Sequence, residues 1–107
     1  MQSIQQLHDA ADDERRKADD IRDEAKKNRQ KSQDNMDNTE VSLRYANEAQ
    51  KNEEKAAQHD EAATKFEAKA TELEAEALEI SRKKNEIQNT SQSQINELDE
   101  QEKKLRG

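Results

Sequence analysis

The sequence contains no cysteine and no proline, and its one glycine is residue 107. The absence of cysteine excludes a disulfide framework and thiolate chemistry. With no proline and no internal glycine, the chain lacks the residues that most strongly break a helix, whereas the abundant Ala, Glu, Lys, Gln and Arg favour helices. We therefore expect long helices.

Large apolar residues are also scarce. Leu, Ile, Val and Phe together number 13 of 107 residues, below the roughly 20% that an ordinary globular core requires. Charged residues make up 42% of the chain, with 26 acids against 19 bases and a net charge of −7. Because the two signs are interleaved, this composition suits solvated helices better than a self-repelling coil. We predict an all-α protein of long coiled-coil helices.

Long hydrophobic runs and aromatic residues are nearly absent. The sequence predicts no cleavable signal peptide and no transmembrane segment, which favours a cytoplasmic protein or export by a signal-independent route. Binding to a membrane surface is not expected, because the apolar positions are mostly alanine with acidic flanks. The negative charge and the shortage of aromatic rings argue against a nucleic-acid partner.

Alanine recurs at every seventh position in the middle of the chain, and a column of larger residues runs beside it at coiled-coil spacing. Two such columns form a seam on one helix face, which is a surface for another helix. Phe66, Leu73, Ile80 and Ile87 are its expected anchors. The predicted helix-packing seam comprises Tyr45, Ala49, Ala56, Ala63, Phe66, Ala70, Leu73, Ala77, Ile80 and Ile87.

The first third of the chain has a small column of its own, Ala11, Ala18 and Ala25. Two small columns allow helices to approach closely, which predicts an antiparallel helical hairpin or elongated bundle. We expect one elongated domain, residues 1–107, with a helix over about 3–33, a polar turn at about 34–39, a helix over about 40–89 and a segment over about 92–106. Thr39, and Thr90 or Ser91, are the expected caps.

Two alternatives to this hairpin remain open at the level of the sequence. Neither polar stretch contains glycine or proline, so both can be polar layers within one continuous rod-like helix in an oligomer. A chain that is largely disordered and folds on binding is also compatible with the low content of large apolar residues.

Catalytic and ligand-binding patterns are missing. The sequence has no nucleophile elbow, phosphate-binding loop, dinucleotide fingerprint or calcium-binding loop, so we expect no enzyme, no cofactor and no small-molecule substrate. His8 and His59 are the only histidines and lie far apart, whereas a closed zinc site needs about four nitrogen or sulfur ligands. No metal site is expected. His59 occupies a seam position, which predicts pH-sensitive assembly if its ring is buried.

A block of acidic residues lies in the predicted second helix: Glu67, Glu72, Glu74, Glu76 and Glu79. In an antiparallel hairpin this block faces residues near the N-terminus, where the charge match is poor. The block is therefore interpreted first as a solvated helix face, and the functional hypothesis is that it pairs with a basic patch of a neighbouring chain, where complementary charges set orientation.

These observations predict a coiled-coil structural or assembly protein. The expected partners are protein helices, with self-association as a homo-oligomer or filament subunit as the leading hypothesis. The alternative is a small acidic helical adaptor, chaperone or secretion-associated factor that binds the helices of another protein.

Overall fold

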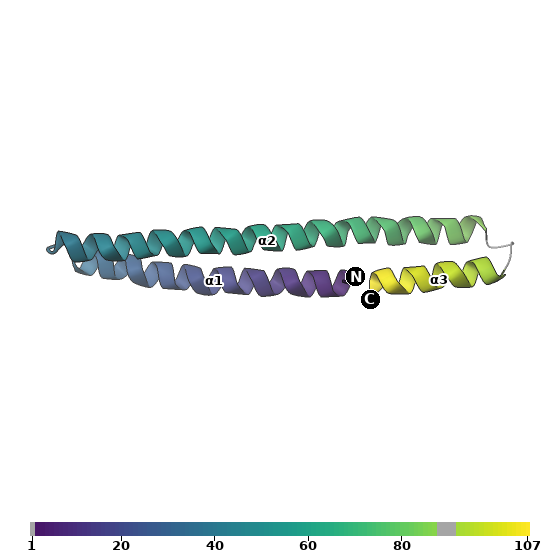
Figure 1. Ribbon diagram of the computed structural model, residues 1–107, viewed down its shortest axis with the longest axis horizontal. Helices are drawn as coiled ribbons and strands as arrows, with labels where there is room; N and C mark the ends of the chain where they lie inside the picture. The colour runs from purple at the N-terminus through teal and green to yellow at the C-terminus, as the bar shows by residue number, and fades with distance from the viewer. Residues whose placement is uncertain (1, 88–91) are drawn as a thin grey trace. The chain divides into compact units, whose positions relative to one another are not determined.

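The computed structural model describes residues 2–87 and 92–107, and these residues form an all-α protein (Figure 1). Helix α1 spans Ile4–Asp34, α2 spans Thr39–Glu86 and α3 spans Gln92–Arg106. The predicted fold class is confirmed, since long helices pair as an antiparallel hairpin. The alternative of one continuous helix is not what this structure shows. The predicted helical residues 88–89 and the proposed caps Thr90 and Ser91 lie outside the described residues.

Polar side chains set the start of both long helices. Ser3 Oγ accepts a hydrogen bond from the Gln6 amide (3.1 Å), and Gln6 Oε1 accepts one from the Ser3 amide (2.9 Å). This reciprocal pair is a capping box, which satisfies two backbone donors at the N-terminus of α1. At the start of α2, Asn38 Oδ1 accepts from the Val41 amide at 3.3 Å. The cap is therefore Asn38 rather than Thr39, and α2 begins one residue earlier than expected.

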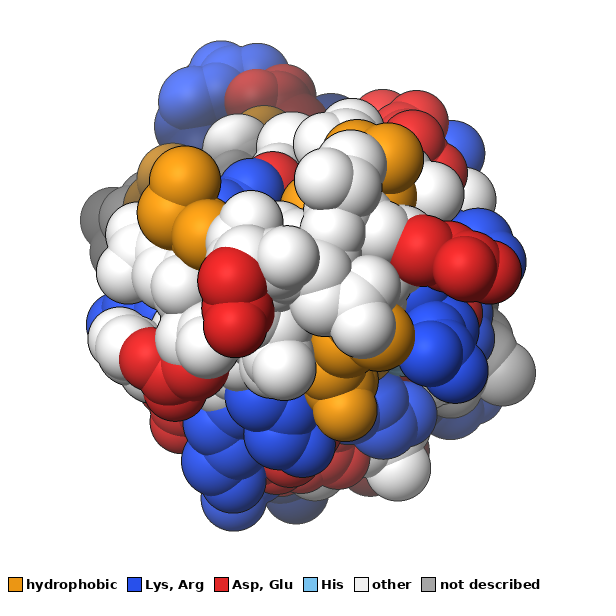
Figure 2. Space-filling view, turned by 90° about the vertical axis from the view of Figure 1, so that its left-hand side faces the viewer, with side chains coloured by type: hydrophobic (Ala, Val, Ile, Leu, Met, Phe, Trp, Pro, Cys, Tyr) orange, Lys and Arg blue, Asp and Glu red, His pale blue; other side chains and the backbone are white. Residues whose placement is uncertain are grey.

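The turn between α1 and α2 consists of residues 35–38. Three successive backbone bonds within it join residues three apart, the tight pattern of a 3₁₀ turn: Asn35 to Ser32, Met36 to Gln33 and Asn38 to Asn35. Figure 2 looks onto the end that carries this turn, where uncharged polar side chains and backbone occupy the centre and hydrophobic side chains form separate spots. The turn is therefore solvated.

The chain divides into two compact units. Unit 2, Asp12–Ala63, contains most of α1, the turn and the first half of α2. Unit 1 combines Met1–Ala11 with Thr64–Gly107, so the start of α1, the second half of α2 and all of α3 pack together there.

Unit 2 has a core made of alanine alone. All of its residues that are buried are alanines, each no more than 2% exposed: Ala18, Ala25, Ala49, Ala56 and Ala63. A methyl group reaches only a short way from its backbone, so alanines can be buried against each other only where the two helices lie close together. Each layer contributes little, about 0.8 kcal/mol per buried methyl, and the helices must be long for the layers to add up.

Unit 1 has larger anchors. Its buried cluster consists of Ile4, Leu7, Ala70, Leu73, Ala77 and Leu105, with Phe66 and Ile80 partly buried against it. The residues come from all three helices, because the first turns of α1 and the whole of α3 both lie along α2 (Figure 1). Gly107 follows α3 with a positive φ of 99°, a conformation that favours glycine, and its amide bonds to the Lys103 carbonyl at 3.0 Å.

Candidate helix–helix interface

The alanine column of α2 forms the floor of the interface in both units. Ala49, Ala56 and Ala63 are buried in unit 2, and Ala70 and Ala77 are buried in unit 1, with exposures of 0–2%. The neighbouring column is less uniform, since only Leu73 is fully buried, whereas Tyr45, Phe66, Ile80 and Ile87 are half-buried. The structure thus places all ten predicted seam residues on packed or partly packed helix faces. Their use between separate chains stays a prediction.

Polar pairs occupy the second column of unit 2. Asn28 Nδ2 on α1 donates to Asn52 Oδ1 on α2 at 2.8 Å, and His59 Nδ1 lies 2.5 Å from Glu14 Oε2. The hydrogen bond from His59, followed by the nearby Lys17, lowers the pKa of Glu14. Such pairs satisfy each other only when the two helices are correctly aligned, and an asparagine at a seam position, here half-buried, can specify coiled-coil register.

Two serines connect the helices next to the turn. Ser32 Oγ donates to the Ser42 carbonyl at 2.8 Å, Ser42 Oγ donates to the Ser32 carbonyl at 2.9 Å, and the two hydroxyl oxygens lie 3.0 Å apart. Lys31 precedes Ser32, and its ammonium lies 5.6 Å from the centre of the Tyr45 ring, within cation–π range. Side-chain contacts between α1 and α2 therefore continue up to the turn.

A charged flank runs beside the seam of unit 2. Arg29 Nη2 lies 2.6 Å from Glu53 Oε2, and Arg22 pairs with Asp60. The hydrogen bond to Asp60 raises the pKa of Arg22. All four side chains are partly solvated, so each pair contributes only modestly to stability. Opposite charges at these positions favour the antiparallel alignment in which they meet.

In unit 1, His8 makes a separate set of cross-helix contacts. Its Nδ1 lies 2.9 Å from Glu67 Oε2 and its Nε2 lies 3.0 Å from Glu74 Oε1. Both ring nitrogens can donate only when the imidazole is doubly protonated, so this geometry fits a charged His8. The two hydrogen bonds, first Glu74 and then Glu67, raise the pKa of His8 above its ordinary value.

Four carboxylates of the acidic block have partners within the chain, and pairing of the block with a neighbouring chain stays a prediction. Glu67 and Glu74 have His8 as a partner, Glu72 lies 3.3 Å from Lys69 Nζ, and Glu79 pairs with Arg82. The acidic residues that contact α1 are not consecutive in the sequence. The relevant signal is instead a column at seven-residue spacing, whose members are Glu53, Asp60, Glu67 and Glu74 on α2 and His8, Arg15, Arg22 and Arg29 on α1.

Helix α3 is attached to α2 by a second set of polar contacts within unit 1. Lys84 Nζ lies 2.6 Å from Asp99 Oδ1 and 3.4 Å from Glu102 Oε1, and Ser81 Oγ donates to Glu102. Asp99 is the main cause of a raised pKa at Lys84, whereas Ser81 and then Lys84 lower the pKa of Glu102. Lys84 replaces alanine in the small column at this point, and two carboxylates from α3 compensate its charge.

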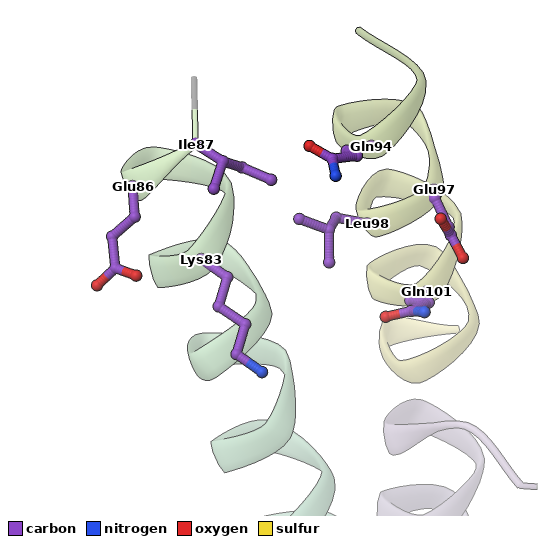
Figure 3. Close-up of a pocket in the computed structure, with 7 residues that line it drawn as sticks. All are labelled: Lys83, Glu86, Ile87, Gln94, Glu97, Leu98 and Gln101. Carbon is purple, nitrogen blue, oxygen red and sulfur yellow. The ribbon is translucent and has the colours of Figure 1, made fainter. Parts of the chain in front are cut away.

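Unit 1 has a groove between α2 and α3 (Figure 3). Ile87 and Leu98 point toward one another across it, and Lys83, Gln94 and Gln101 line its edges. A second, more apolar hollow shares Gln101 and extends past Ile80 and Leu105. Both are open to solvent and have no convergent catalytic side chains, so their chemistry suits contact with another side chain or helix.

Other kinds of site are not found in the described part of the chain. Residues 2–87 and 92–107 contain no group of three or more histidine, cysteine or acidic side chains arranged to hold a metal ion. Over the same residues, no helix combines the length and the apolar character needed to cross a bilayer.

Comparison with known proteins does not assign a family. No family model matches the chain, and no curated protein and no solved structure matches it either.

Proposed function

We propose that this chain is a non-enzymatic coiled-coil structural or assembly protein that acts through helix–helix association, as a homo-oligomer or a filament subunit. The observation that carries the proposal is the pair of alanine columns, buried to 0–2% exposure along both long helices. A surface of this kind is complementary to another helix with the same spacing, and it offers no pocket for a substrate.

The weakness of each alanine layer supports association as the working state. Unit 2 buries only alanines, and folded domains are stable by only about 5–15 kcal/mol in total. A partner that binds the folded state and not the unfolded chain stabilises the folded state, by an amount that grows with the logarithm of the partner's concentration. A second copy of the chain presents the same columns and charged flank, and so satisfies this condition.

Sedimentation equilibrium combined with circular dichroism, over a wide range of protein concentration, tests the proposal. We expect both the mass and the helical content to rise with concentration. The variant Ala63→Lys places a charge in the buried column and should reduce the mass, whereas Ala57→Lys makes the same change on an exposed face and should not. A fully helical monomer at every concentration would refute self-association.

A second candidate function is that of a helical adaptor, and one observation favours it. The alanine columns meet within a single chain, so the hairpin needs no second copy to bury them. In that case the groove with Ile87 and Leu98 is the surface left for a partner helix. The same sedimentation series distinguishes the two, because an adaptor remains a helical monomer until its partner is added.

A further inference from the structure

We propose that the turn at residues 35–38 allows the chain to exchange its hairpin for a domain-swapped antiparallel dimer, in which α1 of each copy pairs with α2 of the other. The inference deepens the proposed self-association by naming the partner, a second copy, and the contacting surface, the seam of unit 2. It rests on three features of that unit: the backbone of the turn, the spacing of the seam and the symmetry of the cross-helix contacts.

The turn lacks the features that most strongly oppose a helix, which are a positive φ, a glycine and a proline. No residue other than glycine has a positive φ among the described residues, and the turn itself contains neither glycine nor proline. Its bonds between residues three apart differ from helical bonds by a single residue. Converting the turn into helix therefore requires no left-handed residue to be forced into an unfavourable conformation.

The seam also continues through the turn. Between residues 25 and 52, the positions that face the partner helix are separated by alternating steps of three and four residues. One step is irregular, from 42 to 45. A single three-residue step is a stammer, which coiled coils absorb by local overwinding. A straight α1–α2 helix would therefore present both halves of the seam on one side. The positions are 25, 28, 32, 35, 39, 42, 45, 49 and 52.

The cross-helix contacts are compatible with two-fold symmetry. When two straight chains lie antiparallel about an axis near Thr39, which lies between the midpoints of the observed pairs, Ser32 of one copy lies close to Ser42 of the other, and the reverse contact forms at the same time. The pairs Asn28–Asn52 and Arg29–Glu53 reform in the same way. An isologous interface of this kind closes at two chains, and exchange of an identical element is a low-cost route to a dimer.

Concentration decides between the two forms. The short turn holds α1 and α2 at an effective concentration of roughly millimolar, so the hairpin dominates in dilute solution and the dimer gains as the protein approaches that range. Asn35, Asp37 and Asn38 are poor residues inside a helix. Replacing them with alanine should favour the straight form and lower the concentration at which dimers appear by about tenfold or more.

A disulfide reports which chain supplies each helix. The protein has no cysteine, and the hydroxyl oxygens of Ser32 and Ser42 lie 3.0 Å apart, so Ser32→Cys with Ser42→Cys places two thiols in contact. The double variant is unfolded, refolded at about 5 μM and at about 1 mM, the concentration range set by the effective concentration of the turn, and then oxidised. We expect cross-linked monomers in the dilute sample and covalent dimers in the concentrated one.

Three controls make the result specific. The single variants Ser32→Cys and Ser42→Cys should give few covalent dimers, because residue 32 meets residue 42 and not its own copy. Adding the alanine turn substitutions, Asn35→Ala, Asp37→Ala and Asn38→Ala, should move covalent dimers to lower concentration. Adding Asp37→Gly instead should retain cross-linked monomers, because glycine disfavours the helix. Equal dimer yields from single and double variants would overturn the proposal.

The outcomes also separate this inference from the proposed function. Cross-linked monomers in a sample that sediments as a dimer would refute the swap and leave self-association intact. Cross-linked monomers that sediment as monomers at every concentration, even with the alanine turn, would refute both.

Discussion

Replacing a buried seam alanine with leucine should destabilise this protein, which is opposite to the effect of leucine in most coiled coils. Ala56 is 0% exposed in unit 2, where all buried neighbours in the core are also alanine. If space were available, the three additional carbons of leucine would stabilise the fold by about 2 kcal/mol, at about 0.8 kcal/mol for each carbon. If the helices are as close as an all-alanine core requires, the larger side chain must push them apart.

We expect Ala56→Leu to lower the free energy of unfolding by about 1–3 kcal/mol, the usual cost of overpacking. For a domain of about 60–100 residues this corresponds to a fall in Tm of roughly 5–20 °C. Thermal and urea unfolding followed by circular dichroism measure both quantities. Ala57→Leu is the matched control, since Ala57 is exposed on the adjacent position, and its effect should stay within about 0.5 kcal/mol.

An increase in stability for Ala56→Leu would contradict this prediction. Leucine would then be filling space between the helices, and the alanine column would be an ordinary buried face rather than a close-packed one. The measurement belongs at low protein concentration, because self-association makes Tm depend on concentration.

Three further predictions concern the polar contacts and the docking of α3. Asn52→Ala should lower the unfolding free energy by about 1–2 kcal/mol because the Asn28 amide loses its partner, and a double-mutant cycle with Asn28→Ala should show that the losses do not add. Because the pKa of His8 is raised, the stability that its protonated ring contributes is complete below pH 6.5 and is lost as the pH rises through the folded pKa. Tm should therefore fall from pH 6 to pH 8.5, and it should fall less in His8→Gln. Equal slopes of Tm against pH in the two proteins would contradict this assignment. Leu105→Ala should cost about 2–5 kcal/mol and expose the amides of α3 to hydrogen exchange, whereas Leu78→Ala, at a residue 67% exposed, should change neither.

Much of the interface followed from the periodicity of the sequence. The five alanines from Ala49 to Ala77 recur at one spacing, and a side chain that repeats every seven residues must return to the same face of a helix. The same logic would have identified the charged flank, because His8 and the acidic column share that spacing. It was missed because neighbouring charges were grouped by sequence proximity, and consecutive residues on a helix point in different directions.

The helical character of the chain, the apolar face of each helix and the small size of most apolar side chains on that face can all be predicted from the sequence. These properties depend on local helix propensity and on a seven-residue repeat that can be read from a single sequence. The three-dimensional structure was needed to show that the alanine columns meet within one chain, that Asn28 faces Asn52 and His59 faces Glu14, and that α3 folds back beside Lys84. A helix with a heptad repeat can pack equally well against a helix of its own chain or of another chain, and in alignments that differ by seven residues. The choice between them depends on a four-residue turn and a few polar pairs whose members are distant in sequence.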